Sequence, residues 1–217
     1  FLDHYDPTHI CNHSDHSGRY AFDEQPGVAL WNLNVLGHAL SLILPEATIR
    51  DALQKYQPKL QRAYSDLMRK KLGLASKRTD DDQLLAGLLT LMQKNQTDYT
   101  IAWRTLCHAQ THPQAFVDLF VDRPSAQAWL NKYSKRLAVD SLSTQARQTQ
   151  MMAANPKYIL RNHLAQQAIE AAEKGDVSVL NRLFEVLKQP YDEQPEHDEL
   201  AKHPPAWARD LDISCSS

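Results

Sequence analysis

Apolar residues recur at steps of three and four positions along most of this chain, and this spacing restricts the fold more than any other feature of the sequence. Residues three or four positions apart lie on the same face of an α-helix. The pattern runs from Pro26 to Pro190, and the one candidate for a strand is a short stretch at residues 19–22. We therefore predict an all-α fold with a helical body over residues 27–190.

Prolines, glycines and capping residues divide this body into separate helices. The first is expected at residues 27–44 and is predicted to be buried through one apolar stripe. This stripe consists of Val28, Trp31, Val35, Ala39, Leu42 and Ile43. The second is expected from Glu46 to Gly73, with a break near Pro58. Later helices are expected to start near Asp82, Asp98, Pro113, Pro124, Ser143, Asn155 and Asp176.

Several polar residues of the helical body allow more than one role. The run Asp80–Asp82 could hold a divalent cation, or could cap the next helix with negative charge near its N-terminus. Asn155 is predicted to be an N-cap, with Pro156 at the first helical position. Arg161 is expected either to pair with a carboxylate of the opening loop or to contact a substrate.

Two expectations concern burial within these helices. Cys107 is predicted to be a small buried side chain inside its helix. The last helix is expected to turn one apolar face inward. The residues of that face are Leu180, Leu183, Phe184 and Leu187.

The composition of the 217 residues is that of a globular protein, with 42% hydrophobic and 23% charged residues. A net charge of −2 gives no electrostatic attraction to nucleic acid or to an anionic membrane, and no apolar run approaches the roughly 20 residues of a membrane span. Three cysteines, an odd number, favour a reducing compartment over a disulfide framework. We expect neither nucleic acid nor membrane as a partner.

The first 26 residues form an irregular loop that is unusually rich in reactive side chains. Four of the ten histidines and one of the three cysteines lie in residues 4–16. Pro7, Ser17, Gly18 and Pro26 interrupt any regular structure. Loops of this composition on a helical scaffold often carry binding or catalytic residues.

Two interpretations of this loop follow from the residues alone. A metal site could be built from Cys11, His13 and His16, with Asp15 or His9 as a fourth ligand, and would define a metal-dependent hydrolase. Alternatively, the His and Asp side chains cap turns by hydrogen bonds to the backbone and do no chemistry.

Three ordered motifs give the chain a resemblance to a known family. They are Phe1-Leu2-Asp3-x-Tyr5-x-Pro7 with Ile10-Cys11-Asn12-His13-Ser14-Asp15-His16-x-Gly18-Arg19-Tyr20, then Asn155-Pro156-x-Tyr158-x-Leu160-Arg161-Asn162, and finally Pro204-Pro205-x-Trp207-Ala208 with Ser214-Cys215-Ser216-Ser217. Together they resemble the selenoprotein O family, also called YdiU-like. Members of that family are similar to protein kinases in fold but transfer AMP from ATP to hydroxyl groups of proteins.

The resemblance implies that this chain is the C-terminal portion of such a protein adenylyltransferase. The chain begins on Phe1 within a motif, just after the position of the family's metal-binding aspartate, so we expect the catalytic residues upstream and none in this segment. Asp3 does not replace that aspartate. ATP with Mg²⁺ or Mn²⁺ is then expected to bind the full-length protein, and this segment alone is expected to bind neither and to be inactive.

The resemblance also divides the chain into three parts and implies its partners. Residues 1–26 would be a loop similar to an activation segment, residues 27–190 a helical C-terminal lobe, and residues 191–217 an extended tail. Asn12, His13, Asp15 and Arg19 are then candidates to face the substrate. The expected partners are proteins with hydroxyl side chains and the missing N-terminal lobe, in the cytoplasm for a bacterial member or in mitochondria for a eukaryotic one.

Cys215 occupies the position at which the resembling eukaryotic proteins carry selenocysteine. A thiol near the end of an extended tail could be a redox group or an inert terminal residue. We hypothesise that Cys215 pairs with Cys11 as a reversible switch, while Cys107 stays free. Two rival classes remain open, namely the metal-dependent hydrolase of residues 9–16 and a helical interaction scaffold without chemistry.

Overall fold

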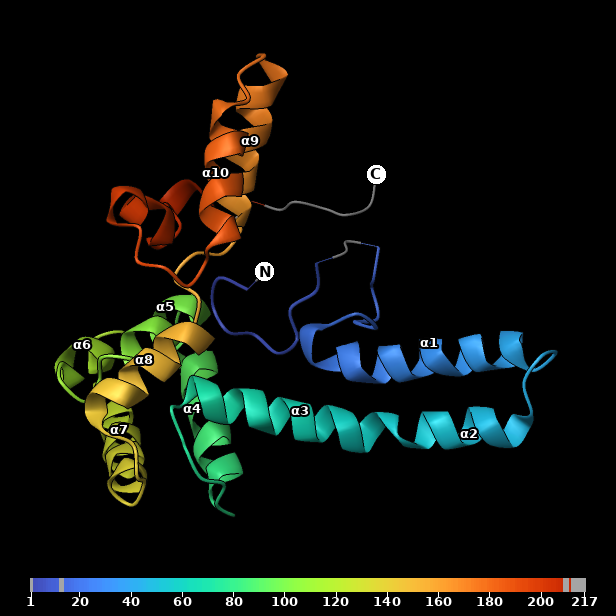
Figure 1. Cartoon of the computed structure of the whole chain (residues 1–217). Coiled ribbons are helices and arrows are strands. Elements are labelled where there is room, and N and C mark those ends of the chain that lie inside the picture. Colours follow the sequence, from blue (N-terminus) through green and yellow to red (C-terminus); the bar gives the residue numbers. More distant parts are fainter. Residues whose placement is uncertain (1, 12–13, 209–210, 212–217) are drawn as a thin grey trace. The chain divides into compact units, whose positions relative to one another are not determined.

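The computed structural model describes residues 2–11, 14–208 and 211, and within them it confirms the all-α prediction. These residues contain no β-strand, and their one isolated β-bridge joins His4 to Asp98. Three short 3-10 helices accompany the α-helices, at Phe22–Glu24 (η1), Pro195–Ala201 (η2) and Ala206–Ala208 (η3). The α-helices are α1 (Gln25–Leu40), α2 (Glu46–Gln54), α3 (Tyr56–Lys71), α4 (Asp81–Asn95), α5 (Tyr99–Leu106), α6 (Pro113–Val117), α7 (Arg123–Ala138), α8 (Thr144–Ala154), α9 (Asn162–Glu173) and α10 (Ser178–Lys188) (Figure 1).

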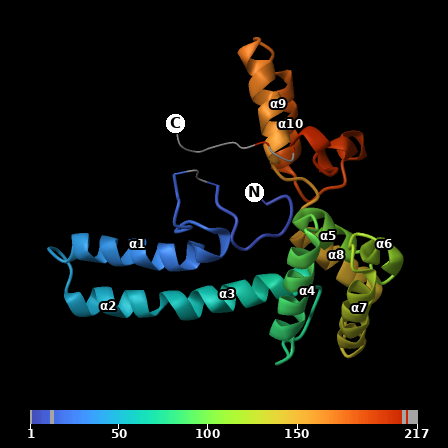
Figure 2. The ribbon, with the colours of Figure 1, turned by 180° about the vertical axis from the view of Figure 1, so that it is seen from behind.

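The described residues fall into two compact units. The smaller unit, residues 6–67, contains the opening loop, η1, α1, α2 and most of α3, with α1 antiparallel to α2 and α3 (Figure 2). The larger unit consists of the described residues within 1–5 and 68–213, and contains α4 to α10. No helix in the described part of the chain is long and apolar enough to cross a membrane.

The helix ends follow the local chemistry of the sequence. Asp98, Asp122 and Ser143 each accept a backbone N–H bond at the start of α5, α7 and α8, as N-caps do. Gly73 and Gly175 follow α3 and α9 with φ of +65° and +84°, a conformation that is costly for residues with a Cβ. The predicted break near Pro58 is confirmed, because α2 ends at Gln54 and α3 begins at Tyr56.

The larger unit has two apolar clusters. The main one joins the end of α3 to α4–α8 through large side chains that include Leu88, Trp103, Phe116 and Tyr133. The hydroxyl of Tyr133 donates to the Leu72 carbonyl at 2.8 Å, so a buried polar group is satisfied. The second cluster lies between α9 and α10, which pack side by side. Cys107 is buried in the main cluster, as predicted, but it is the C-cap of α5 rather than a residue inside the helix.

The prediction for the first helix is wrong in two respects. Helix α1 ends at Leu40 rather than at residue 44, and its predicted inward stripe is largely exposed, with only Gly37 fully buried in the helix. A Cβ on Gly37 would lie 2.6 Å from the Cγ2 of Ile49, so this glycine is the point at which α1 approaches α2. The side of α1 that carries Gly37 is therefore the packed side.

The predicted N-cap at Asn155 is also wrong. Asn155 is the C-cap of α8 and is fully buried, and α9 begins only at Asn162. The intervening residues are held away from helical geometry because the backbone N–H groups of Lys157 and Tyr158 both donate to the Pro190 carbonyl. A contact from a distant segment thus replaces the local helix start that the sequence favours.

Three smaller expectations need correction. Residues 19–22 form a turn leading into η1 instead of a strand, since the Ala21 N–H donates back to the Gly18 carbonyl. The side chain of Asp80 makes no capping bond at the start of α4. Leu180 and Phe184 of α10 are exposed, because α9 covers only the side of α10 that carries Leu183.

Candidate functional site

The opening loop is organised by the carboxylate of Asp15. Its oxygens accept the backbone N–H of Arg19 at 2.9 Å, the N–H of Tyr20 at 2.7 Å and the hydroxyl of Ser17 at 3.2 Å. The backbone bond from Tyr20 contributes most to lowering the pKa of Asp15 below its ordinary value. Asp15 therefore caps a turn, which is the role that the structural interpretation of this loop expected for its acidic residues.

The same turn places Arg19 over an aromatic ring. Its guanidinium carbon lies 4.4 Å from the ring centroid of Trp31, within the range of a cation–π contact. Beside it is an open groove of about 400 Å³. The groove is lined by Ser17, Gly18, Arg19, Glu24, Gly27, Val28 and Trp31. Arg19 and Glu24 give the lining of this groove one positive and one negative side chain.

The other predicted residues of the loop are placed as follows. Cys11 is exposed and is a free thiol. Asn12, His13 and Cys215 lie outside the described residues, so the structure does not test the site that would contain His13 or the Cys11–Cys215 pair. The described residues hold no group of three His, Cys, Asp or Glu side chains arranged to bind a metal.

In the larger unit, Arg161 pairs with two carboxylates. Its guanidinium lies 2.5 Å from an oxygen of Asp3 and 2.8 Å from an oxygen of Asp98, and its side chain is almost fully buried. Asp3 belongs to the opening motif. Of the two roles that the sequence allowed for Arg161, the structure therefore contains the pairing with a carboxylate of the opening loop. Asp98 was not anticipated as a partner, because its sequence context indicated only a helix cap.

A second buried pair joins Asp81 to Arg136. The Arg136 Nε donates to a carboxylate oxygen of Asp81 at 2.6 Å, and both side chains are about 95% shielded from solvent. Asp81 also accepts the backbone N–H of Arg78 at 2.8 Å. The middle aspartate of the acidic run is thus committed to an ion pair inside the protein.

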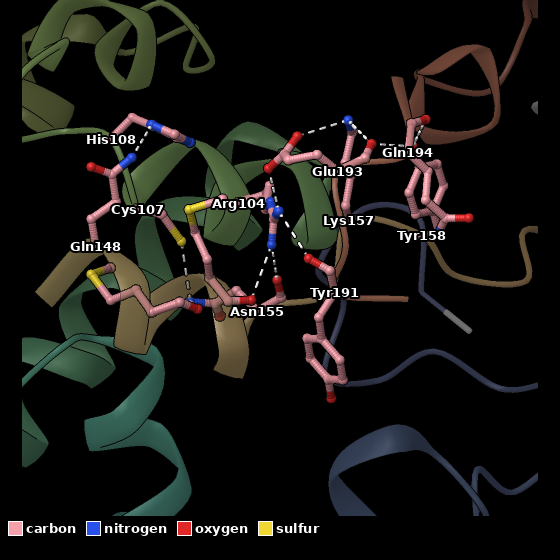
Figure 3. Close-up of polar contacts among 12 residues, drawn as sticks. Arg104, Cys107, His108, Gln148, Asn155, Lys157, Tyr158, Tyr191, Glu193 and Gln194 are labelled. Atoms are coloured by element: carbon pink, nitrogen blue, oxygen red, sulfur yellow. Dashed lines mark hydrogen bonds and ion pairs between the residues drawn. The ribbon is translucent and has the colours of Figure 1, made fainter. Parts of the chain in front are cut away.

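A polar network around Arg104 ties the chain after α8 to the segment after α10 (Figure 3). One guanidinium nitrogen of Arg104 donates to the carbonyls of Met152 and Asn155, and the other to the Tyr191 carbonyl and, at 2.5 Å, to the carboxylate of Glu193. Lys157 donates to the same carboxylate at 2.9 Å. Burial opposes ionisation of Glu193, but the bonds from Lys157 and Arg104 keep its pKa below the ordinary value.

The network shows that residues 191–198 are anchored by specific contacts. Sequence patterns missed Arg104, Lys157 and Glu193, since single charged residues on helices and loops carry no signal of their distant partners. Arg104 and Lys157 donate to carbonyl and carboxylate oxygens, whereas the Oδ1 of Asn155 is buried without a hydrogen-bond partner. The contacts among Arg104, Lys157 and Glu193 present no nucleophile next to a general base. We interpret the network as structural.

Lys71 lies in an environment that perturbs its charge. Its amine lies 4.9 Å from the ring centroid of Trp103, and burial lowers its pKa to about 8. Burial also raises the pKa of Cys107, whose sulfur accepts a hydrogen bond from the Asn155 amide at 3.6 Å.

Comparison with known proteins defines the class to which these features belong. The family model described as "Protein adenylyltransferase SelO" matches residues 1–188. The chain therefore belongs to this family, as the resemblance of its motifs implied.

Individual relatives agree with this assignment. The chain is 51% identical over its whole length to the protein nucleotidyltransferase YdiU of Yersinia pseudotuberculosis, 50% identical to that of Pectobacterium atrosepticum and 49% identical to that of Vibrio vulnificus strain YJ016. It spans 45%, 45% and 46% of the lengths of these relatives. The chain thus spans less than half the length of the curated relatives it matches.

Proposed function

We propose that this chain is the C-terminal portion of a protein nucleotidyltransferase that transfers AMP from ATP to hydroxyl side chains of proteins. The observation that carries the proposal is the family match over residues 1–188, together with about 50% identity to YdiU proteins along the whole chain. Since those proteins are about twice as long, the proposal assigns the catalytic residues to the part that this chain does not cover.

ATP and Mg²⁺ or Mn²⁺ are the cofactors that this function requires. Phosphoryl and nucleotidyl transfer depend on metal ions and cationic groups that neutralise phosphate charge. The described residues do not fit that task, because they offer no cluster of acidic or imidazole side chains for the ion. We therefore assign cofactor binding to the full-length protein and derive no catalytic step through this chain.

The opening loop is proposed to act as an activation segment that presents the protein substrate. Two observations support this role: the turn fixed by Asp15, and the groove between Arg19 and Glu24. Asn12 and His13 are proposed to belong to the same substrate-facing surface. The helical lobe of residues 27–190 would then support the loop, and the missing N-terminal lobe would complete the enzyme.

The thiols are proposed to regulate this activity. Cys11 is exposed on the opening loop, whereas Cys107 is buried and its pKa is raised by burial, so only Cys11 of these two is accessible to an oxidant. A bond between Cys11 and Cys215 would connect the tail to the loop and would be reversible in a reducing compartment. The bacterial relatives support a cytoplasmic location.

A single assay tests the proposed function. The full-length protein and the 217-residue chain are each incubated with labelled ATP, Mg²⁺ or Mn²⁺ and a protein acceptor, and label on protein is measured. We expect metal-dependent transfer of AMP by the full-length protein and none above background by the chain alone. Transfer by the isolated chain would refute the assignment of catalysis to the remainder of the protein.

A second measurement, elemental analysis of the isolated chain, addresses the rival class. A hydrolase that used the His and Cys residues of positions 9–16 would bind zinc in the isolated chain, and elemental analysis would detect it in stoichiometric amount. We expect less than stoichiometric metal after dialysis, and no change in metal content when Cys11 is replaced by serine.

A further inference from the structure

The segment from Gln25 to Pro45 contains no Asp, Glu, Lys or Arg, although charged residues make up 23% of the chain. Most of it forms α1, in which apolar residues occur on all sides of the helix. A helix of this kind is normally buried, either in the core of a large protein or within a membrane, and no described helix meets the length and hydropathy of a membrane span. In the described structure, however, Gly37 is its only fully buried residue.

One side of α1 has a partner within its own unit. Gly37 lies against Ile49 of α2, and the hydroxyl of Tyr56 at the start of α3 donates to the Pro26 carbonyl at 3.1 Å. These contacts fix which side of α1 faces α2 and α3. Elsewhere on α1, the Arg19 guanidinium lies over the Trp31 ring, while large apolar side chains toward the end of the helix stay exposed.

The end of α1 and the turn after it expose apolar side chains. Val35 and Leu36 are 47% and 54% exposed, and Leu42 and Ile43, just beyond the helix, are 92% and 76% exposed. We call these four residues the outer stripe. Single exposed apolar residues are ordinary, but a group of four within nine consecutive positions indicates a surface that another protein segment covers.

We propose that the outer stripe is the docking face for the part of the full-length protein that this chain does not contain. The inference rests on the proposed function only in assuming that such a remainder exists. The relatives provide the reason for choosing this occupant: they match the whole of this chain, yet more than half of their length lies outside the match. A stripe without charge requires apolar side chains on the segment that covers it.

The stripe also differs from the surfaces that other occupants would favour. A membrane-surface helix carries Lys and Arg along its polar side, and α1 has neither. The sequence also disfavours a helix whose outer side stays in water, because polar residues would then occupy one face of that helix. An apolar segment of the same folded protein fits the uncharged stripe best.

Thiol labelling at one position of the stripe tests the proposal. Val35→Cys is made in a Cys11→Ser background, in the full-length protein and in the 217-residue chain, and the rate of maleimide labelling is measured. Val121→Cys is the control, because Val121 is 90% exposed and lies far from α1 in the sequence. We expect Val35→Cys to react at least about tenfold more slowly in the full-length protein than in the chain, and Val121→Cys to react equally in both.

Three results would overturn the proposal. Equal labelling of Val35→Cys in both proteins would show that the remainder does not cover the stripe. Slow labelling in the isolated chain at every concentration would mean that the chain covers the stripe itself, and slow labelling only at high concentration would indicate a second copy. Protection that requires added anionic lipid vesicles would assign the stripe to a membrane.

Backbone hydrogen exchange supplies a measurement without any substitution. Amides of residues 25–44 should exchange more slowly in the full-length protein than in the chain, whereas those of α10 should not change. The AMP-transfer assay on the same samples separates the two proposals. Active full-length protein with an unprotected stripe refutes only the docking face, and a protected stripe in an inactive protein refutes only the function.

Discussion

Arg161 binds Asp98 through both guanidinium nitrogens, at 2.8 Å and 3.2 Å, although 63 positions separate the two residues. Each residue is the N-cap of a helix, Asp98 of α5 and Arg161 of α9, so the pair joins the beginnings of two helices. Both side chains are buried. Such a bidentate pair restricts the relative orientation of the two helix ends that it joins.

Replacing Arg161 should destabilise the larger unit strongly. Arg161→Met leaves the buried Asp98 carboxylate without its cation, and we expect a loss of about 3–5 kcal/mol in the free energy of unfolding. The control is Arg123→Met, since Arg123 and Asp118 form an ion pair with both side chains at least half exposed, and its loss should cost less than about 1 kcal/mol. Urea titration followed by tryptophan fluorescence measures both. Equal effects would contradict a special role for the buried pair.

Lys71 should make stability depend on pH in a defined window. Burial lowers its pKa from 10.5 to about 8 in the folded state, so the unfolded chain binds more protons between these values. Stability contributed by this residue therefore rises from about pH 8 to 10.5, and below pH 8 its charge is a cost.

The substitution Lys71→Met tests this sign. It should stabilise the protein at pH 7 by about 1–3 kcal/mol, and the advantage over the wild type should shrink as the pH rises toward 10.5. Lys70→Met is the matched control, because Lys70 is exposed at the neighbouring position and should show no such trend. A constant difference at all pH values would contradict the lowered pKa.

The two glycines after α3 and α9 should tolerate alanine differently. Both have positive φ, so Gly175→Ala should cost about 1 kcal/mol of backbone strain. At Gly73 the new Cβ would also lie 2.6 Å from the Cγ of Arg147 and 2.7 Å from Met151, whereas Gly175 has open space. We expect Gly73→Ala to cost about 2–4 kcal/mol in total. Thermal unfolding of the two variants compares them directly.

The turn of the opening loop should loosen when Asp15 loses its charge. Its pKa is lowered by hydrogen bonds in the folded loop, so the stabilisation that it gives is present above the ordinary value of 3.8 and is lost as the pH falls below it. Amide exchange at Arg19 and Tyr20, whose N–H groups bind Asp15, should accelerate in Asp15→Ala at neutral pH. Unchanged exchange at both amides would show that the carboxylate does not hold the turn.

The proposed thiol pair predicts a specific oxidation product. Mild oxidation of the reduced full-length protein should remove two free thiols, and digestion without reductant should yield one peptide pair that contains Cys11 and Cys215. Cys11→Ser and Cys215→Ser should each abolish it, while Cys107→Ser should not, since Cys107 is buried in the main cluster. A pair that contains Cys107 would refute the assignment.

Much of the secondary structure was predictable because it depends on neighbours in the sequence. The caps at Asp98 and Ser143, the stop at Gly73 and the break near Pro58 are local effects, and the structure contains all of them. The candidate site was less accessible to prediction. Asp15 was recognised as a site candidate, but its turn-capping bonds and the contact of Arg19 with Trp31 depend on how the loop folds back.

The sequence by itself determined the family, the all-α class and the ends of most helices, because motifs, periodicity and capping are written in consecutive residues. Only the tertiary structure decided that Asn155 ends α8 instead of starting α9, and that Gly37 rather than the Trp31 side of α1 faces α2. Those outcomes depend on Pro190 and Ile49, which are distant in sequence. A periodic pattern gives the faces of a helix, but the partner that packs against one of them comes from elsewhere in the fold.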